Sequence, residues 1–323
     1  MTYIEEESLL FPRKEFKNEP ASQLSTHFHC FPSVVYNDEV HTFDEVISTL
    51  PRAADVDKDT AIGFATLIDR EGRCIVKCSG FAPCTLVKTL TEKQTGRNRD
   101  NKPIKVHVML GHVVAHQNFA LRLLAWIQTI LDKSVGFRAL FSQIMFDKMD
   151  RSAKISRLEN FLRHDTCLWK AARSQVHHLF VSGMLLEHDT KRRFAEVFTR
   201  NYGPLMKDFI NDDHEHSFSV TSLSVQIFTV PTLAIHLVGH CQVLFNLINT
   251  FLSECERKRN PAGKLEFHRN LNSHTFKRAS FILHDLKYVL TTAPKENEWT
   301  DDLRKGFLHG VSKFVSILSM VQV

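Results

Sequence analysis

Apolar and polar positions between residues 31 and 110 follow two different periods. Three short runs rich in β-branched and aromatic residues predict strands: residues 33–36, 73–78 and 104–109. Between them, apolar positions recur three and four residues apart and predict helices: residues 42–50, 57–67 and 82–93. This order of elements predicts an α+β domain of about eighty residues, in which helices lie on one face of three strands.

Polar residues mark the boundaries of the first predicted helix. Thr42 is a capping residue type, and Glu45, three positions later, completes a capping box. Pro51 lacks the backbone N–H that a continuing helix needs, so we expect the helix to end there.

After Gly111 the pattern is helical as far as the C-terminus. Phe119, Leu123 and Ile127 form an apolar stripe at helical spacing. Further helices are expected over residues 137–149, 152–164, 166–188, 190–201, 203–212, 219–229, 230–256, 273–293 and 300–320. Their spacing has no fixed period, so a regular solenoid is not predicted. The chain is therefore expected to comprise a lead-in (1–30), an α+β domain (31–110) and an all-α domain (111–323).

Residues 230–252 are long and apolar enough to be considered as a membrane span. Polar side chains interrupt this stretch at five positions: His236, His240, Gln242, Asn246 and Asn249. Placing these groups in hydrocarbon would be costly, and four of them lie near one helical stripe. We therefore predict a buried helix with one polar seam.

Composition narrows the classes of function. Apolar residues make up 43% of the chain, and 25 Phe against 12 Gly and 10 Pro favours packed helices. The net charge of +5 is small for 323 residues, and the basic runs lack the interleaved aromatic residues of a nucleic-acid platform. Seven scattered cysteines and an acidic N-terminus without a signal-peptide pattern predict free thiols in a reducing compartment, the cytoplasm or the nucleus. We expect neither nucleic acid nor a membrane as a partner.

The most informative segment, residues 36–43, lies at the junction between the first strand and the first helix. It places an Asn, two acids and a His beside apolar side chains. Hydrogen-bond acceptors next to an apolar surface suit a ligand that combines a cation with a hydrophobic group, such as a free α-amino terminus and its side chain. The same residues also fit an ordinary loop followed by a helix cap, and their spacing leaves both interpretations open.

The segment 35–43, Val-Tyr-Asn-Asp-Glu-Val-His-Thr-Phe, resembles the signature of ClpS, the bacterial adaptor for N-degrons. It resembles still more the ClpS-like domain of the UBR family of N-recognin E3 ubiquitin ligases. The resemblance continues in order through residues 61–66, 69–73, 103–106, 115–119, 168–173, 212–215, 231–234 and 285–290. It implies a ClpS-like domain with a three-stranded antiparallel sheet, followed by a helical region.

The resemblance implies a polar role for four residues. In ClpS the Asn-Asp pair of this motif accepts hydrogen bonds from the α-ammonium, which here implies Asn37 and Asp38. In the UBR ligases the Asp and the His three residues later belong to the site for bulky hydrophobic N-termini, here Asp38 and His41. ClpS has a His before a turn, in the pattern His-x-x-Gly, where this chain has Asp69. Asp69 remains an acceptor and adds a charge.

The resemblance also implies an apolar pocket for the first side chain of the ligand. Phe43, Ala65 and Ile68 match the pocket positions of ClpS, and Val40 lies beside them in the motif. Ala65 is smaller than the Met of the bacterial protein, which leaves the size of the pocket open.

The implied function is recognition of type-2 N-degrons in the N-end rule pathway, as the substrate-binding part of a UBR ligase. Expected partners are proteins with a free N-terminal Phe, Tyr, Trp, Leu or Ile, and other parts of such a ligase. The zinc-bound UBR box and the RING-type domain of these ligases need dense Cys/His arrays, which this sequence lacks. We therefore expect no catalytic residue, metal or cofactor in this chain. The alternative is a paralogue that acts as a helical adaptor or competes with a full ligase.

Two further groups of residues have metal-ligand chemistry. Four tetrahedral ligands can be drawn from His27, His29, Cys30, Cys74 and Cys78, but thiols without a metal and a surface His are the simpler interpretation. Residues 212–216, Asp-Asp-His-Glu-His, are more simply a solvated helix end.

Overall fold

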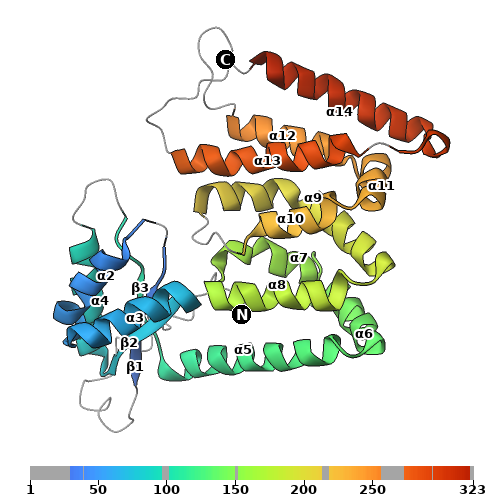
Figure 1. The fold of residues 1–323 in the computed structure, drawn as a ribbon. Helices are drawn as coiled ribbons and strands as arrows, with labels where there is room; N and C mark the ends of the chain where they lie inside the picture. Colours follow the sequence, from blue (N-terminus) through green and yellow to red (C-terminus); the bar gives the residue numbers. More distant parts are fainter. Residues whose placement is uncertain are drawn as a thin grey trace. The chain divides into compact units, whose positions relative to one another are not determined.

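The computed structural model describes residues 30–38, 40–96, 102–149, 152–212, 218–255, 273–292 and 294–320 (Figure 1). By backbone contacts the chain forms two compact units. The first combines Met1–Thr129, Cys167–His178 and His214–Ser217, and the second combines Ile130–Thr166, Leu179–Asp213 and Phe218–Val323. All but the last residue of the predicted lead-in lies outside the described residues.

The first unit is built on a three-stranded antiparallel sheet with the order β2-β1-β3. The central strand β1 (Phe31–Tyr36) pairs with β2 (Arg73–Ser79) on one side and with β3 (Val106–Val108) on the other. Every residue of β1 is buried, because both faces of the central strand are covered. The predicted sheet is confirmed.

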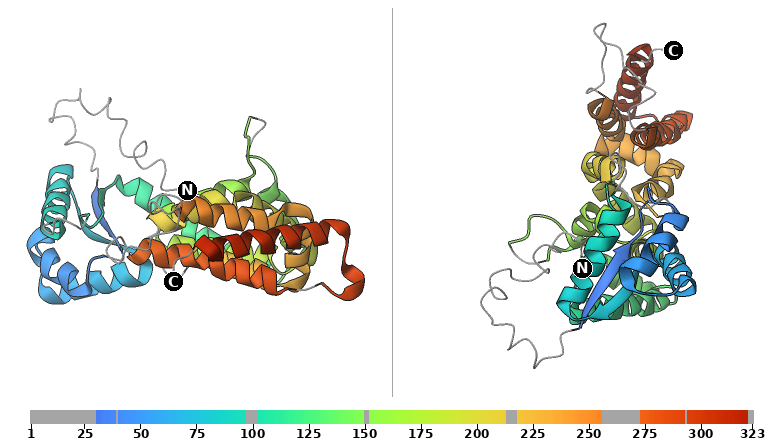
Figure 2. Two further views of the ribbon diagram at one scale, coloured as in Figure 1. Left: turned by 90° about the horizontal axis from the view of Figure 1, so that it is seen from above. Right: turned by 90° about the vertical axis from the view of Figure 1, so that its left-hand side faces the viewer.

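Three helices cover one face of this sheet, as Figure 2 shows: α2 (Phe43–Ala54), α3 (Lys58–Glu71) and α4 (Phe81–Thr95). The Thr42 hydroxyl caps α2 as predicted, accepting the N–H of Glu45 at 3.3 Å. Asp57 caps α3 in the same way, accepting the N–H of Thr60 at 2.7 Å. Both helices therefore begin where the sequence pattern places them.

The prediction that Pro51 ends the first helix is wrong. Pro51 lies inside α2, which continues to Ala54. A proline removes one hydrogen bond from the helix. The residues after it offset that loss by packing, since Ala53 and Ala54 are 7% and 2% exposed.

The helices and the sheet share one hydrophobic core. Its buried members come from every strand and helix named so far: Val35, Val46, Leu50, Ala54, Ala61, Ala65, Ile68, Val76, Val87, Ile104 and Val106. Phe31, Cys84 and Val108 form a second cluster that joins β1, β3 and α4. Burial of this apolar surface holds the helices on the sheet.

Arg73 joins the rest of the first unit to the sheet. Its guanidinium lies over the ring of Trp169, 3.5 Å from the centroid, and donates to Gln117 Oε1 at 2.6 Å. Gln117 belongs to α5 (Gly111–Leu131), and Trp169 directly precedes α8 (Lys170–Met184). One arginine on β2 therefore links three segments that are far apart in the sequence.

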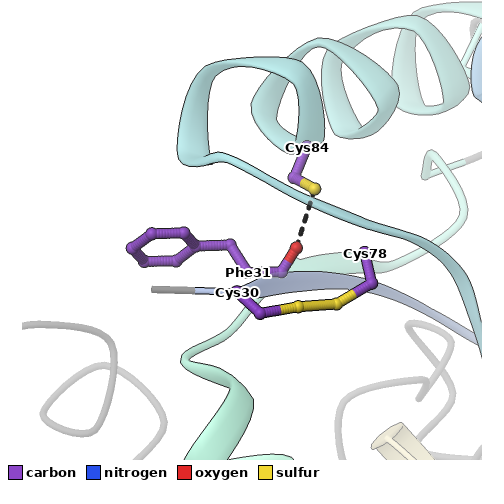
Figure 3. The surroundings of a disulfide bond; sticks show 4 residues. All are labelled: Cys30, Phe31, Cys78 and Cys84. Carbon is purple, nitrogen blue, oxygen red and sulfur yellow. Dashed lines mark hydrogen bonds between the residues drawn. A yellow bond between two sulfur atoms is a disulfide. The ribbon is translucent and has the colours of Figure 1, made fainter. Parts of the chain in front are cut away.

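Cys30, just before β1, and Cys78 on β2 are joined by a disulfide, with their Cα atoms 6.1 Å apart (Figure 3). Cys84 lies close by on α4, and its thiol donates to the Phe31 carbonyl at 2.7 Å. The prediction that every thiol is free is wrong for Cys30 and Cys78. Pairing of β1 with β2 brings together residues 48 positions apart, and their spacing in the sequence does not indicate this register.

The second unit is helical. Besides the ends of α5 and α8, it contains α6 (Val135–Phe146), α7 (Arg157–Arg163), α9 (His188–Asp212), α10 (Val220–Phe228), α11 (Pro231–Cys241), α12 (Val243–Cys255), α13 (Ser273–Thr291) and α14 (Asp301–Met320). Short 3-10 turns occur at Asp165–Cys167 and Glu296–Glu298. Helix α12 packs against α9, α13 and α14, which are seen side by side in Figure 1.

Two predicted helix boundaries in this unit are wrong. The two helices expected over residues 190–201 and 203–212 are one helix, because α9 runs through Pro204 and buries Leu205 and Met206, which are 3% and 0% exposed. The single helix expected over residues 230–256 is divided into α11 and α12 at Gln242. Gln242 has a φ of 51°, a left-handed conformation that ends a helix.

Of the polar residues predicted in this stretch, His236 and Asn246 bond within this unit, whereas His240, Gln242 and Asn249 are exposed. His236 Nε2 lies 2.8 Å from Glu196 Oε1, and Asn246 Nδ2 donates to the Thr199 carbonyl at 3.4 Å. Within the described ranges, no single helix is long and apolar enough to cross a membrane. The pair α10 and α11 meets that test together, by length and composition only, and is bent by 97°.

A buried carboxyl group lies between three helices of the second unit. Asp285 on α13 is 2% exposed and accepts the hydroxyls of Tyr202 and Ser224, each at 2.7 Å. Burial raises the pKa of Asp285 to about 7, and the two hydrogen bonds oppose that rise. Burial also raises the pKa of Tyr202 well above its ordinary value, so its hydroxyl remains a donor.

Candidate functional site

The chain between β1 and α2 folds around the side chain of Asp38. Asp38 Oδ1 accepts the backbone N–H groups of Val40 at 3.0 Å and His41 at 2.9 Å. Asp38 Oδ2 lies 2.7 Å from His41 Nδ1. An Asp that bonds the backbone two and three residues later stabilises a turn, which explains this local structure. The carboxylate is thereby held in one orientation with the side chain 23% exposed.

His41 positions this carboxylate from the protein side. Its side chain is 1% exposed. A carboxylate oxygen only accepts, so His41 Nδ1 carries the hydrogen of the contact with Asp38. His41 Nε2 is buried and has no hydrogen-bond partner among the residues that the structure describes. The geometry therefore suits orientation of Asp38 better than direct contact with a ligand.

Asn37 lies next to the C-terminal end of α3. Its backbone N–H donates to the carbonyl of Gly72 at 2.9 Å. Gly72 ends α3 with a φ of 83°, and its N–H donates to the Ile68 carbonyl at 2.8 Å. Asp69 belongs to the last turn of this helix. The structure thus brings the Asn-Asp pair beside the turn that carries Asp69.

Lys170 also reaches this turn, and the sequence pattern did not single it out. Its Nζ donates to the Asp69 carbonyl at 3.0 Å. A Cβ on Gly72 would lie 2.6 Å from the Cβ and the backbone N of Lys170, so only glycine fits at this close approach. Lys170 and Asp69 are 101 residues apart, and no local pattern reports such a contact.

The C-terminal end of α3 is electrostatically suited to a cation. The last carbonyl groups of a helix together carry a partial charge of about −0.5. Asp69 adds a carboxylate to the last turn, and the Asp38 carboxylate lies at the adjacent junction. Within the protein, the Lys170 ammonium already donates to the Asp69 carbonyl at this helix end. The α-ammonium of a peptide offers donors of the same kind.

The predicted apolar residues fall into two groups. Val40 and Phe43 are 54% and 46% exposed, one beside Asp38 and the other at the first position of α2. Ala65 and Ile68 are each 2% exposed and belong to the hydrophobic core. Val40 and Phe43 are therefore accessible to a ligand, whereas Ala65 and Ile68 pack among the helices.

The residues considered as metal ligands do not form one group. Across the described part of the chain, no three His, Cys, Asp or Glu side chains are gathered as ligands. Cys30 and Cys78 bond to each other. Burial raises the pKa of Cys74 to about 11, so its thiol is protonated near neutral pH. His27, His29 and residues 213–216 lie outside the described residues.

A three-stranded sheet with helices on one face, and acceptors displayed at a strand-to-helix junction, defines a ClpS-like domain. Residues 29–107 match the family of the ATP-dependent Clp protease adaptor protein ClpS. Residues 127–323 match the UBR1/2/3-like ARM repeat domain. The helices have no fixed period in the sequence, so this match, and not their spacing, assigns the helical region to a repeat-domain family.

The chain belongs to the UBR family of E3 ubiquitin-protein ligases. It is 40% identical over 300 residues to E3 ubiquitin-protein ligase UBR2 of Homo sapiens. The aligned region covers 92% of this chain and 17% of that protein. It is 40% identical over 298 residues to E3 ubiquitin-protein ligase UBR1 of Drosophila melanogaster, covering 90% of this chain and 16% of that protein. The chain thus spans about a sixth of the length of the curated relatives it matches.

Proposed function

We propose that this chain binds type-2 N-degrons, which are proteins and peptides whose free N-terminus begins with Phe, Tyr, Trp, Leu or Ile. It acts as the substrate-binding part of a UBR-type ligase and carries out no chemistry itself. One observation carries this proposal: the Asp38 carboxylate is held at the junction of β1 and α2 beside Asn37, whose backbone bonds to the C-terminal end of α3.

The α-ammonium binds through charge-assisted hydrogen bonds. Asp38 Oδ1 already accepts two backbone N–H groups. Among the described residues, Oδ2 accepts only from His41 Nδ1, so it keeps acceptor capacity for the ligand. The side-chain oxygen of Asn37 and the carboxylate of Asp69 complete the set of acceptors. An acetylated N-terminus has no cation and leaves these acceptors without a charged donor in the complex.

The first side chain of the ligand packs against Val40 and Phe43. Burying a Leu or Phe side chain contributes about 1.5–3 kcal/mol, which separates bulky hydrophobic N-termini from Gly. Together with the ammonium contacts this predicts a dissociation constant of about 1 μM, or about −8 kcal/mol.

The direct test is fluorescence polarisation with four labelled peptides that differ only at the first position: Phe, acetyl-Phe, Arg and Gly. The proposal expects binding of the Phe peptide alone. Equal binding of Phe and acetyl-Phe excludes an ammonium site, and binding of none of the four excludes the function for this chain.

Three variants locate the site. Asp38→Asn keeps an oxygen for the turn but removes the charge, and Asp69→Ala removes the acceptor at the end of α3. Loss of one charge-assisted hydrogen bond costs about 1.5–3 kcal/mol, so each variant should bind the Phe peptide about 10- to 100-fold more weakly. Asp59→Ala is the matched control, because Asp59 is an exposed acid in the first turn of the same helix. Full affinity in Asp38→Asn and Asp69→Ala would exclude this location.

A second candidate function, a scaffold that competes with a full-length ligase, is favoured by the outer face of α14. Leu308, Val311 and Val315 recur there at helical spacing and are 71%, 48% and 57% exposed. Exposed apolar stripes of this kind often mark protein interfaces. Absence of peptide binding together with capture of a UBR ligase fragment would favour this function over the first.

A further inference from the structure

The outer face of α5 exposes an apolar seam formed by Phe119, Leu123 and Trp126. These side chains are 64%, 41% and 59% exposed. They lie four and three residues apart, the spacing with which one helix packs against another element. On a different face of α5, Val114 and Gln117 are 4% and 8% exposed. A helix that is buried on one face and apolar on another is typical of an element covered on more than one side.

The α5 seam has a cationic border. Between Gly111 and Leu131 the sequence contains no Asp or Glu, and Arg122 is its single Lys or Arg. Arg122 is exposed and precedes Leu123 directly. His112 and His116 extend the same face toward the start of the helix, with ring centroids 6.2 Å apart. A complementary occupant therefore combines bulky apolar side chains with acidic ones.

The chain itself contains a segment of this chemistry. Residues 3–11 read Tyr-Ile-Glu-Glu-Glu-Ser-Leu-Leu-Phe, with three consecutive acids followed by three apolar residues in four positions. The segment lies outside the described residues. We propose that residues 3–11 dock on the α5 seam. The apolar residues 9–11 cover Phe119, Leu123 and Trp126, and the acids 5–7 face Arg122.

The position of Cys30 makes docking within one molecule favourable. The Cys30 carbonyl accepts the N–H of Gly111 at 2.9 Å, so the chain enters β1 beside the first residue of α5. A tether of roughly twenty residues, from 11 to 30, has a root-mean-square reach of about 22–26 Å. The seam between Phe119 and Trp126 lies about 12–22 Å along the helix from Gly111. Effective concentration is highest when the length of a tether matches the span, so docking within one molecule is favoured over docking between two copies.

The test measures both surfaces in the full chain. Hydrogen–deuterium exchange of residues 1–15 should be slower in the protein than in the free peptide of the same sequence. Leu10→Asp should raise the exchange of this segment and the hydroxyl-radical modification of Trp126 about tenfold, the factor expected for one lost apolar contact. Trp169, which is 6% exposed, is the internal control and should keep its rate of modification.

A charge exchange tests the acidic half of the contact. Arg122→Glu should lower the protection of residues 3–11, and replacing Glu5, Glu6 and Glu7 by Lys in that variant should restore it. Lys133→Glu is the matched control, because Lys133 is an exposed cation beyond the end of α5. The proposal is overturned if the segment in the parent chain exchanges its amide hydrogens as fast as the free peptide does. It is also overturned if Leu10→Asp leaves the rate of hydroxyl-radical modification of Trp126 unchanged. Protection that increases with protein concentration also overturns it, because the occupant is then a second copy.

Discussion

Replacing Asp285 by Asn should change how the stability of the second unit depends on pH. Asp285 is buried and accepts hydroxyl hydrogens from Tyr202 and Ser224. The ordinary pKa of an Asp side chain is 3.8, and burial raises that of Asp285 to about 7. The folded protein therefore binds this proton more tightly than the unfolded chain does.

The sign and size of the effect follow from that difference. A shift of about three units corresponds to about 4 kcal/mol. Because the folded pKa is the higher one, this stabilisation is fully present below about pH 4 and is lost as the pH rises to about 7. Asn has a similar volume and does not ionise, so the variant does not lose stability in this window. Relative to the parent, Asp285→Asn should gain about 4 kcal/mol between pH 4 and 8.

Hydrogen exchange of peptides from α13, followed through a urea titration at each pH, measures the free energy of unfolding of this unit. The readout is the difference between variant and parent at the same pH, because other groups titrate in the same range. His107 is one of them: burial, with repulsion from Lys105 and Lys88, lowers its pKa to about 4, so the first unit loses stability as the pH falls. Asp302→Asn, an exposed change on α14, is the control and should run parallel to the parent. The reasoning is refuted if the free energy of unfolding of Asp285→Asn depends on pH in the same way as that of the parent.

Two further predictions concern the first unit. Gly72→Ala should lower the free energy of unfolding by about 1–3 kcal/mol, because it places a side chain at a residue with positive φ and against Lys170. Urea denaturation measures this free energy. An unchanged value would mean that α3 ends differently. Binding of the Phe peptide should weaken as well, since the Gly72 carbonyl holds Asn37. Cys30→Ser should lower the free energy of unfolding by about 4 kcal/mol, the loop-closure value for a separation of 48 residues. Equal melting temperatures of the parent with and without reductant would show that the bridge to Cys78 is absent in solution.

Part of the candidate site follows from local sequence, because its contacts are local. Asp38 bonds the backbone of residues two and three positions later, so one short motif contains both the acceptor and its support. Burial of His41 behind this carboxylate is not visible in the motif, since a His next to acids fits a surface loop equally well. Asp69 matches by resemblance, but its place beside Asn37 depends on a hydrogen bond between the end of β1 and the cap of α3.

The sequence by itself determined the order and type of the elements around the sheet, the helical character of the region that follows and the position of the acidic turn. These features depend on the burial of alternate or helically spaced residues and on capping, which act over a few positions. The helix ends predicted at Pro51 and next to Pro204 were wrong, because the packing of later residues outweighs one missing hydrogen bond.

Only the tertiary structure decided the contacts between distant segments. It joined Cys30 to Cys78, placed Lys170 at the end of α3, ended α11 at Gln242 and turned Phe119 and Trp126 outward. The physical reason is common to all four. A local pattern reports which residue types can be buried, whereas strand register and helix packing decide which of them meet.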